Sequence, residues 1–217
     1  MNPTDLHTST DVGTPDGELL AELGPQAAVF DFDGTLVDTH TVNTDAAHAS
    51  LTDLGLAVPE RWLHTAPLAD LTALRQRLRS DLDLRLPCTD GEFVDRTRAH
   101  WLTLSDRVRP IARVAALARE LAQAVPVAVA SANDGQVVRA GLTAADLGGL
   151  FEVIVAREHV PRLKPAPDAY LLATAKLAVP PDRCVAFENT AEGLEAARAA
   201  GIPVIDIRDT TWAVQRP

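Results

Sequence analysis

The chain has 217 residues and a formal net charge of −10, with 47% hydrophobic and 23% charged residues. This balance predicts a soluble core with room for a smaller inserted unit, and no run approaches the roughly 20 apolar residues of a membrane span. An acidic chain without a basic stripe argues against nucleic-acid and membrane partners. A small phosphorylated substrate is still compatible, because a bound cation can reverse the charge inside one pocket.

The first segment, residues 1–24, holds five acidic residues and no lysine or arginine. Its Thr, Asp, Gly and Pro content predicts a flexible acidic leader. It lacks the basic and apolar regions of a secretory signal. Cys88 and Cys184, the two cysteines of the sequence, are interpreted as reduced packing residues. We therefore expect a cytoplasmic protein.

From residue 26 onward, short apolar runs typical of buried strands alternate with stretches of helical periodicity. This alternation predicts an α/β fold, with a Rossmann-like parallel sheet that helices cover on both faces. The predicted strands are 27–32, 126–130, 153–156, 184–187 and 203–207, and the helices between them are 111–123, 135–144, 167–177 and 191–200.

A long stretch without strand-like runs follows the first predicted strand. Apolar residues recur there with helical periodicity over 42–54, 68–82 and 91–104. Such an insertion predicts a helical cap domain over residues 39–108, at the sheet edge where α/β proteins bind ligands. Residues 25–38 and 109–217 would then form the core.

Two acids, Asp31 and Asp33, end the first predicted strand, and Gly34 and Thr35 follow them. Alternate side chains of a strand share a face, so both carboxylates can point toward one spot. There one acid could act as a nucleophile and the other as a proton shuttle, beside a cation and a phosphoryl group. The alternative is a strand that ends in a solvated turn rich in Asp and Gly.

Three later segments also place polar residues near strand ends. The Ser131 hydroxyl, with N–H groups at a helix start, suits phosphate oxygens, although Ser131 and Asn133 could merely cap the helix. Lys164 precedes a proline, which disfavours helix at the lysine; it could neutralise a phosphoryl oxygen or lie on the surface. Glu188 and Asn189 end a buried strand and are either oxygen donors for a hard cation or turn residues.

The order of these segments, Asp31-Phe32-Asp33-Gly34-Thr35, Ser131, Lys164-Pro165 and Glu188-Asn189, resembles the haloacid dehalogenase-like superfamily, in members with a helical cap. Over residues 26–207 the chain is similar to the sugar-phosphate phosphatase and β-phosphoglucomutase branch. The resemblance implies a Mg²⁺-dependent phosphatase that acts on a small phosphorylated metabolite such as a sugar phosphate. The alternatives are a phosphomutase and a ligand-binding relative without activity.

The resemblance also implies a role for each motif residue. Asp31 would attack phosphorus and form an aspartyl-phosphate. Asp33 would protonate the leaving oxygen and then deprotonate the hydrolytic water. The phosphoryl oxygens would be held by Ser131, the N–H of Ala132 and Lys164. Dehalogenases lack the second aspartate, so Asp33 disfavours dehalogenation.

The resemblance places Mg²⁺ on the Asp31 carboxylate, the Asp33 main-chain carbonyl, Glu188 and Asn189. Relatives usually carry two acids in the last motif, whereas the second residue here is Asn189. An amide oxygen still ligates Mg²⁺, but one negative charge is missing, so we expect weaker metal binding. Mutases carry a histidine where this chain has Asn43, and its absence favours hydrolysis.

The predicted cap contains two further groups of interest. Arg75 and Arg79 share one helical face and could meet an anionic substrate. A solvated charged face is the more common arrangement for such a run. Trp62 and Trp101 are interpreted as core residues of the cap.

Overall fold

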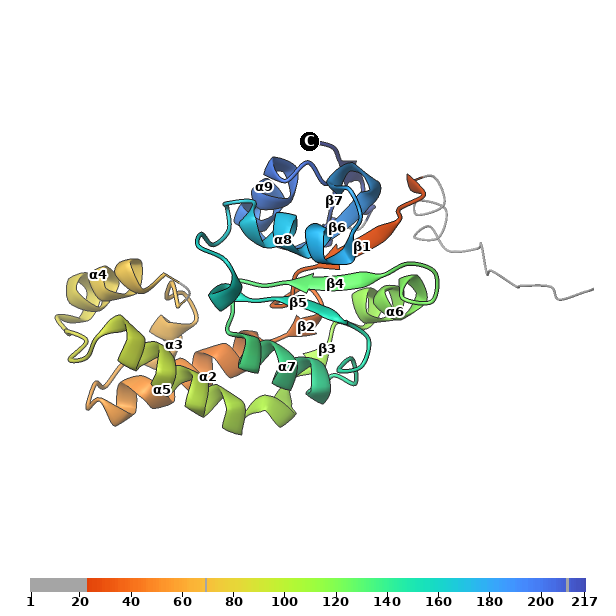
Figure 1. The fold of residues 1–217 in the computed structure, drawn as a ribbon. Helices are drawn as coiled ribbons and strands as arrows, with labels where there is room; N and C mark the ends of the chain where they lie inside the picture. Colours follow the sequence, from red (N-terminus) through yellow and green to blue (C-terminus); the bar gives the residue numbers. More distant parts are fainter. Residues whose placement is uncertain (1–22, 69, 210) are drawn as a thin grey trace, which may run out of the picture.

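The computed structural model describes residues 23–68, 70–209 and 211–217. At its centre is a six-stranded sheet in the order β5-β4-β1-β6-β7-β8, flanked by helices (Figure 1). The first five of these strands are parallel, and β8 pairs with β7 in the antiparallel direction. The predicted α/β class with a parallel sheet is confirmed. Apart from Leu23 and Gly24, the predicted acidic leader lies outside the described residues.

The strands of this sheet are β1 (Ala27–Phe30), β4 (Val127–Ala130), β5 (Val153–Val155), β6 (Cys184–Glu188), β7 (Val204–Asp206) and β8 (Val214–Gln215). The helices around it are α6 (Ala112–Leu121), α7 (Gly135–Ala144), α8 (Asp168–Leu177) and α9 (Ala191–Ala199), with single 3₁₀ turns at Arg157–His159 and Pro181–Arg183.

The two faces of the sheet bury different side chains. Every residue of β1, β4 and β6 is buried, as expected for parallel strands covered on both sides. On the face covered by α6 and α7, Phe30 stacks on Phe187 with ring centroids 4.7 Å apart. The face covered by α8 and α9 presents mainly small side chains, such as Ala128 and Ala186, so these helices pack closely against the strands.

A helical insertion leaves the core after β1 and returns before α6 (Figure 1). It contains α2 (His40–Asp53), α3 (Glu60–Leu63), α4 (Leu71–Leu82), α5 (Asp90–Thr103) and a 3₁₀ turn at Ser105–Arg107. We call residues 39–108 the helical insertion. Buried leucines and Phe93 give it a hydrophobic cluster of its own. Its status as a separate domain stays a prediction.

The exit and the return of the insertion are held together by a short antiparallel pair. Strand β2 (Val37–Asp38) pairs with β3 (Arg109–Pro110). Neither this pair nor the one-turn helix α3 was predicted, because elements of two to four residues are too short to show a periodicity. Among the described residues, no helix combines the length and the apolar character required to cross a membrane.

Candidate active site

The site lies where the carboxyl ends of three neighbouring strands meet. In the sheet register, Phe30 of β1 lies beside Val129 of β4 on one side and Phe187 of β6 on the other. Asp31, the residue after β1, is therefore flanked by the end of β4, with Ser131 beyond it, and by Glu188 at the end of β6. The parallel register thus brings together segments that are far apart in the sequence.

Lys164 joins two acids in the interior of the protein. Its Nζ lies 2.6 Å from Asp31 Oδ1 and 2.5 Å from Glu188 Oε1. The Lys164 side chain is 7% exposed, and those of Asp31 and Glu188 are 10% and 0% exposed. Lys164 is therefore not a surface lysine, and two carboxylates share one ammonium group.

The charges in this cluster do not balance. Burial and the nearby Glu188 charge raise the pKa of Asp31 from 3.8 to about 7, even though Lys164 acts in the opposite direction. Burial also lowers the pKa of Lys164, but the Asp31 and Glu188 carboxylates outweigh it and raise that pKa above its usual value. With both acids ionised, the cluster holds one negative charge without a counter-charge, which favours a cation or proton there.

The Glu188 carboxylate is saturated with hydrogen bonds. Its Oε1 accepts from Lys164 and from the Tyr170 hydroxyl at 3.0 Å. Its Oε2 accepts from the Asn189 N–H at 2.9 Å and from the Thr190 N–H and hydroxyl at 3.1 and 3.0 Å. A carboxylate has about four lone-pair sites, so a cation that binds Glu188 directly has to displace one of these donors.

Gly193, in the first turn of α9, makes room for this carboxylate. A Cβ added at Gly193 would lie 1.9 Å from Glu188 Cδ. The Thr190 hydroxyl, which donates to Glu188, also accepts from the Gly193 N–H at 3.0 Å and caps the helix. The start of α9 is therefore built closely around Glu188.

Asn189 faces the turn that follows the two aspartates. Its Oδ1 accepts a hydrogen bond from the buried Thr35 hydroxyl at 3.2 Å. Gly34 has φ +72°, a left-handed conformation that favours glycine, and a Cβ there would lie 2.3 Å from Asn189 Nδ2. A carbonyl oxygen has two lone pairs. One lone pair of Asn189 Oδ1 accepts the Thr35 hydrogen bond, and the second can still coordinate a cation.

Asp33 is held by three side chains from outside its own turn. The Thr39 hydroxyl donates to Asp33 Oδ1 at 2.6 Å, and Asn43 Nδ2 lies 3.4 Å from the same oxygen. Asn133 Nδ2 donates to Asp33 Oδ2 at 3.2 Å. Neither the contact of Asn133 with Asp33 nor that of Thr39 was predicted from the sequence. The spacing of Thr39 and Asn43, four residues apart on one helical face, was an available signal.

The segment after β4 carries the Ser131 hydroxyl group. The Ser131 N–H bonds the Val155 carbonyl at 2.9 Å, and Ser131 Oγ accepts from the Asn133 N–H at 3.0 Å. Among the described residues the Ser131 hydroxyl proton has no acceptor, so it is left to donate to a bound anion. The Ala132 carbonyl accepts from Arg157 Nε at 3.0 Å, which anchors the loop beside Ser131.

Two groups in the insertion have structural contacts. Arg75 pairs with Asp90 at 2.7 Å and donates to the Leu86 and Cys88 carbonyls, so it braces the insertion. Trp62 packs against the insertion's own cluster, as predicted. The prediction for Trp101 is wrong in one respect. Trp101 is buried in the hydrophobic cluster that contains Phe30 and Phe187 of the sheet, because its helix α5 also contacts α7 of the core.

The candidate ligand atoms of Asp31, Asn189 and Glu188 are oxygens, which suit a hard cation such as Mg²⁺. Among the described residues, no three His, Cys, Asp or Glu side chains gather as a preformed metal centre. The unbalanced charge at Asp31 and the remaining lone pair of Asn189 nevertheless fit a divalent cation. The fit depends on one carboxylate, that of Asp31, and one amide, that of Asn189.

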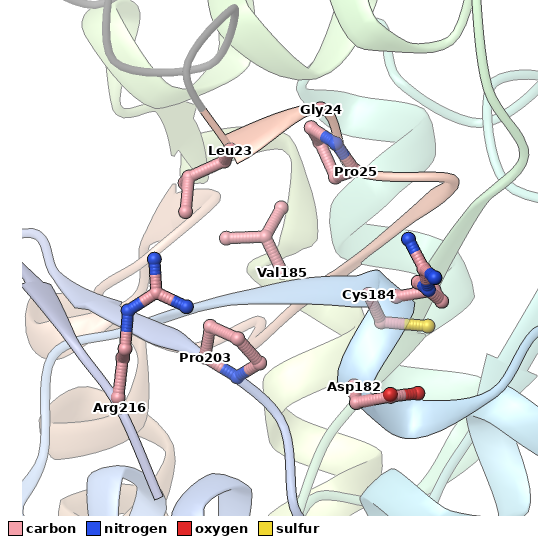
Figure 2. A pocket seen from close by; sticks show the side chains of 9 residues that line it. Leu23, Gly24, Pro25, Asp182, Cys184, Val185, Pro203 and Arg216 are labelled. Atoms are coloured by element: carbon pink, nitrogen blue, oxygen red, sulfur yellow. The ribbon is translucent and has the colours of Figure 1, made fainter.

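A separate cavity of about 230 Å³ lies at the amino edge of the sheet (Figure 2). Its lining includes Pro25, Asp182, Cys184 and Arg216, close to where β1 and β6 begin. Because Asp31 and Glu188 are at the carboxyl ends of these strands, this cavity is distinct from the candidate active site.

Comparisons with known proteins find relatives that cover most of this chain. Residues 25–201 match the family model of haloacid dehalogenase-like hydrolases. Fructose-1-phosphate phosphatase YqaB from Escherichia coli (strain K12) is 31% identical over 184 residues, which cover 83% of this chain and 95% of the relative. Hexitol phosphatase B from the same strain is 32% identical over 182 residues, covering 80% and 79%. The crystal structure of CbbY from Rhodobacter sphaeroides in complex with phosphate has a TM-score of 0.73 at 28% identity, covering 84% and 85%.

Proposed function

The chain belongs to the haloacid dehalogenase-like hydrolase family. We propose that it is a phosphatase of small phosphorylated metabolites and that it acts through an aspartyl-phosphate formed on Asp31. The observation that carries this proposal is the buried Lys164 between Asp31 and Glu188. Relatives that are a fructose-1-phosphate phosphatase and a hexitol phosphatase favour a sugar phosphate or sugar-alcohol phosphate as substrate. A cytoplasmic location stays a prediction.

In the first step, an Asp31 oxygen attacks phosphorus while the bond from phosphorus to the leaving oxygen breaks. Asp33 donates its proton to that leaving oxygen, because an alkoxide is a poor leaving group. In the second step, Asp33 takes a proton from water as the water attacks the aspartyl-phosphate. Inorganic phosphate leaves and the Asp31 carboxylate is restored.

The phosphoryl oxygens need donors that compensate their charge. The Ser131 hydroxyl proton, the Ala132 N–H and Lys164 are the groups that we assign to this task. Lys164 already touches Asp31, so it lies beside the reacting centre in the resting enzyme. Fixed donors of this kind stabilise charge in the transition state without reorganisation.

Mg²⁺ would be held by Asp31, the Asp33 main-chain carbonyl and Asn189. When bound, it would neutralise charge on Asp31 and on the phosphoryl group. Glu188 was expected as a further ligand. Its five donors support a different primary role, in which it positions Lys164 and contributes negative charge to the metal site.

Phosphate release from a panel of sugar phosphates, sugar-alcohol phosphates and other small phosphomonoesters tests the proposal. We expect no release in EDTA, release that saturates with added Mg²⁺, and none from Asp31→Asn. Each product is also analysed for isomerised sugar phosphate. Activity retained in Asp31→Asn contradicts the nucleophile, and an isomer without released phosphate would indicate a mutase instead.

The amide at Asn189 is expected to weaken metal binding. Asn189→Asp restores a negative charge at a proposed ligand, so it should lower the Mg²⁺ concentration for half-maximal activity several-fold. Asn189→Leu, of similar size without an oxygen donor, should raise it. The measurement is a Mg²⁺ titration of phosphate release. An unchanged midpoint in both variants excludes Asn189 as a ligand.

A further inference from the structure

A row of hydrogen-bonding side chains runs from the helical insertion to Asp33. Trp101 Nε1 on α5 donates to Asn43 Oδ1 on α2 at 2.7 Å. Asn43 Nδ2 lies 3.3 Å from Thr39 Oγ1 and 3.4 Å from Asp33 Oδ1. The Thr39 hydroxyl then donates to Asp33 Oδ1 at 2.6 Å. Trp101 is 2% exposed, so its N–H has no ready access to solvent.

The chemistry of these groups gives the row one direction. An indole N–H donates and never accepts, so Trp101 holds the oxygen of the Asn43 amide toward itself. The Asn43 NH₂ group must then face Thr39 and Asp33. Because that NH₂ group also only donates, the Thr39 hydroxyl accepts from it and gives its own proton to Asp33. Two donors therefore converge on Asp33 Oδ1.

The other oxygen of Asp33 has different surroundings. Its Oδ2 accepts from Asn133 Nδ2 at 3.2 Å. The Asn133 carbonyl oxygen accepts from the Asp134 N–H at 2.8 Å, which keeps the NH₂ group turned toward Asp33. Asn133 belongs to the loop that begins at Ser131. Oδ2 is thus the oxygen on the side of the proposed phosphoryl-binding loop.

We infer that Asn43 and Trp101 are positioning residues that reserve Asp33 Oδ1 as an acceptor and leave Oδ2 to carry the proton given to the leaving oxygen. A proton on Oδ1 would face the donors from Thr39 and Asn43, whereas Oδ2 has a lone pair to spare. The inference rests on the proposed role of Asp33 and extends it to two residues of the helical insertion. Proton delivery then depends on how α2 and α5 pack together.

The test compares two leaving groups in the same enzyme preparation. The probes are an alkyl phosphate and p-nitrophenyl phosphate. The alkyl phosphate is fructose 1-phosphate, unless another alkyl phosphate of the panel is turned over faster, in which case that compound is used. An alkoxide needs a proton as it leaves, whereas p-nitrophenolate leaves without one. The measured quantity is kcat/KM, which covers steps up to aspartyl-phosphate formation. A ratio between two substrates is unaffected by any loss of folded protein.

The variants are Asn43→Leu, which keeps the size but loses the amide, and Trp101→Phe, which loses the indole N–H. We expect each to lower kcat/KM for the alkyl phosphate by about 10- to 100-fold and for p-nitrophenyl phosphate by less than about threefold. The double variant should be no worse than Asn43→Leu, because Trp101 acts through Asn43.

Trp62→Phe is the matched control. It removes another indole N–H bond in the helical insertion, to Asp81 at 2.8 Å, without a link to Asp33. It should change both substrates equally and little. If Asn43→Leu and Trp101→Phe lower both substrates equally, their role is structural and the inference is overturned.

Asp33→Asn separates this inference from the function beneath it. It should show the same preference for p-nitrophenyl phosphate in a stronger form. If Asp33→Asn shows no such preference, the proposed acid role of Asp33 fails. If it does and the two positioning variants do not, the inference alone fails.

Discussion

Replacing Lys164 by methionine is expected to lower kcat/KM for phosphate release by about 100- to 1,000-fold or more, the range found when one fixed donor to transition-state charge is removed. Methionine fills similar space without charge. Lys164 is buried against Asp31 and Glu188, and no other described cation forms an ion pair with either carboxylate. The measurement is steady-state phosphate release with saturating Mg²⁺.

The same variant should lose stability in a pH-dependent way. The pKa of Asp31 is 3.8 ordinarily and about 7 in the folded protein, so the contribution of Asp31 to folding stability falls as pH rises through this interval. Lys164 limits this rise of the pKa, and without it the pKa of Asp31 moves higher still. The Lys164→Met protein should therefore continue to lose stability at pH values well above the native pKa of Asp31, where the contribution of Asp31 in the native protein levels off. Its Tm deficit in EDTA grows between pH 6 and 9.

Lys176→Met provides the control, since Lys176 is the other lysine of the chain and lies exposed on α8. It should leave both activity and Tm close to those of the native protein. A Lys164→Met protein with native kcat/KM would remove Lys164 from the mechanism. A Tm deficit that is constant with pH would show that the carboxylates are not in the charged cluster seen here.

Gly193→Ala is expected to destabilise the protein by about 1–3 kcal/mol, as overpacking of a close contact does, and to lower activity at least about tenfold. The added Cβ would lie 1.9 Å from Glu188 Cδ, so either the carboxylate or the start of α9 has to move. Either movement breaks hydrogen bonds to Glu188 and releases Lys164 from its position. Tm and kcat/KM measured together test both effects.

Gly91→Ala is a matched control for this change. Gly91 also lies in the first turn of a helix, α5, but nothing is within 4 Å of a Cβ added there. Alanine has the higher helix propensity by up to about 1 kcal/mol, so Gly91→Ala should be neutral or slightly stabilising and fully active. If Gly193→Ala behaves in the same way, the close fit of α9 around Glu188 is not needed for function.

Several features were determined by the sequence alone. Continuous apolar runs and the helices between them predicted the parallel sheet, because a strand buried on both faces must be apolar along its whole length. Asp31 and Glu188 were candidate site residues because they end predicted strands, and Lys164 because it precedes a proline. These are local patterns of a few residues, so they can be read without knowing what packs against them.

The tertiary structure decided the contacts that make these residues a site. Lys164 meets Asp31 across 133 positions of the sequence, and Trp101 meets Asn43 across 58. Burial of Trp101 against the sheet and saturation of Glu188 by donors depend on such distant partners. Periodicity reports which face of an element is apolar, but not which element covers that face. The direction of the hydrogen bonds to Asp33 therefore depends on the packing of α2 against α5, which the sequence pattern does not give.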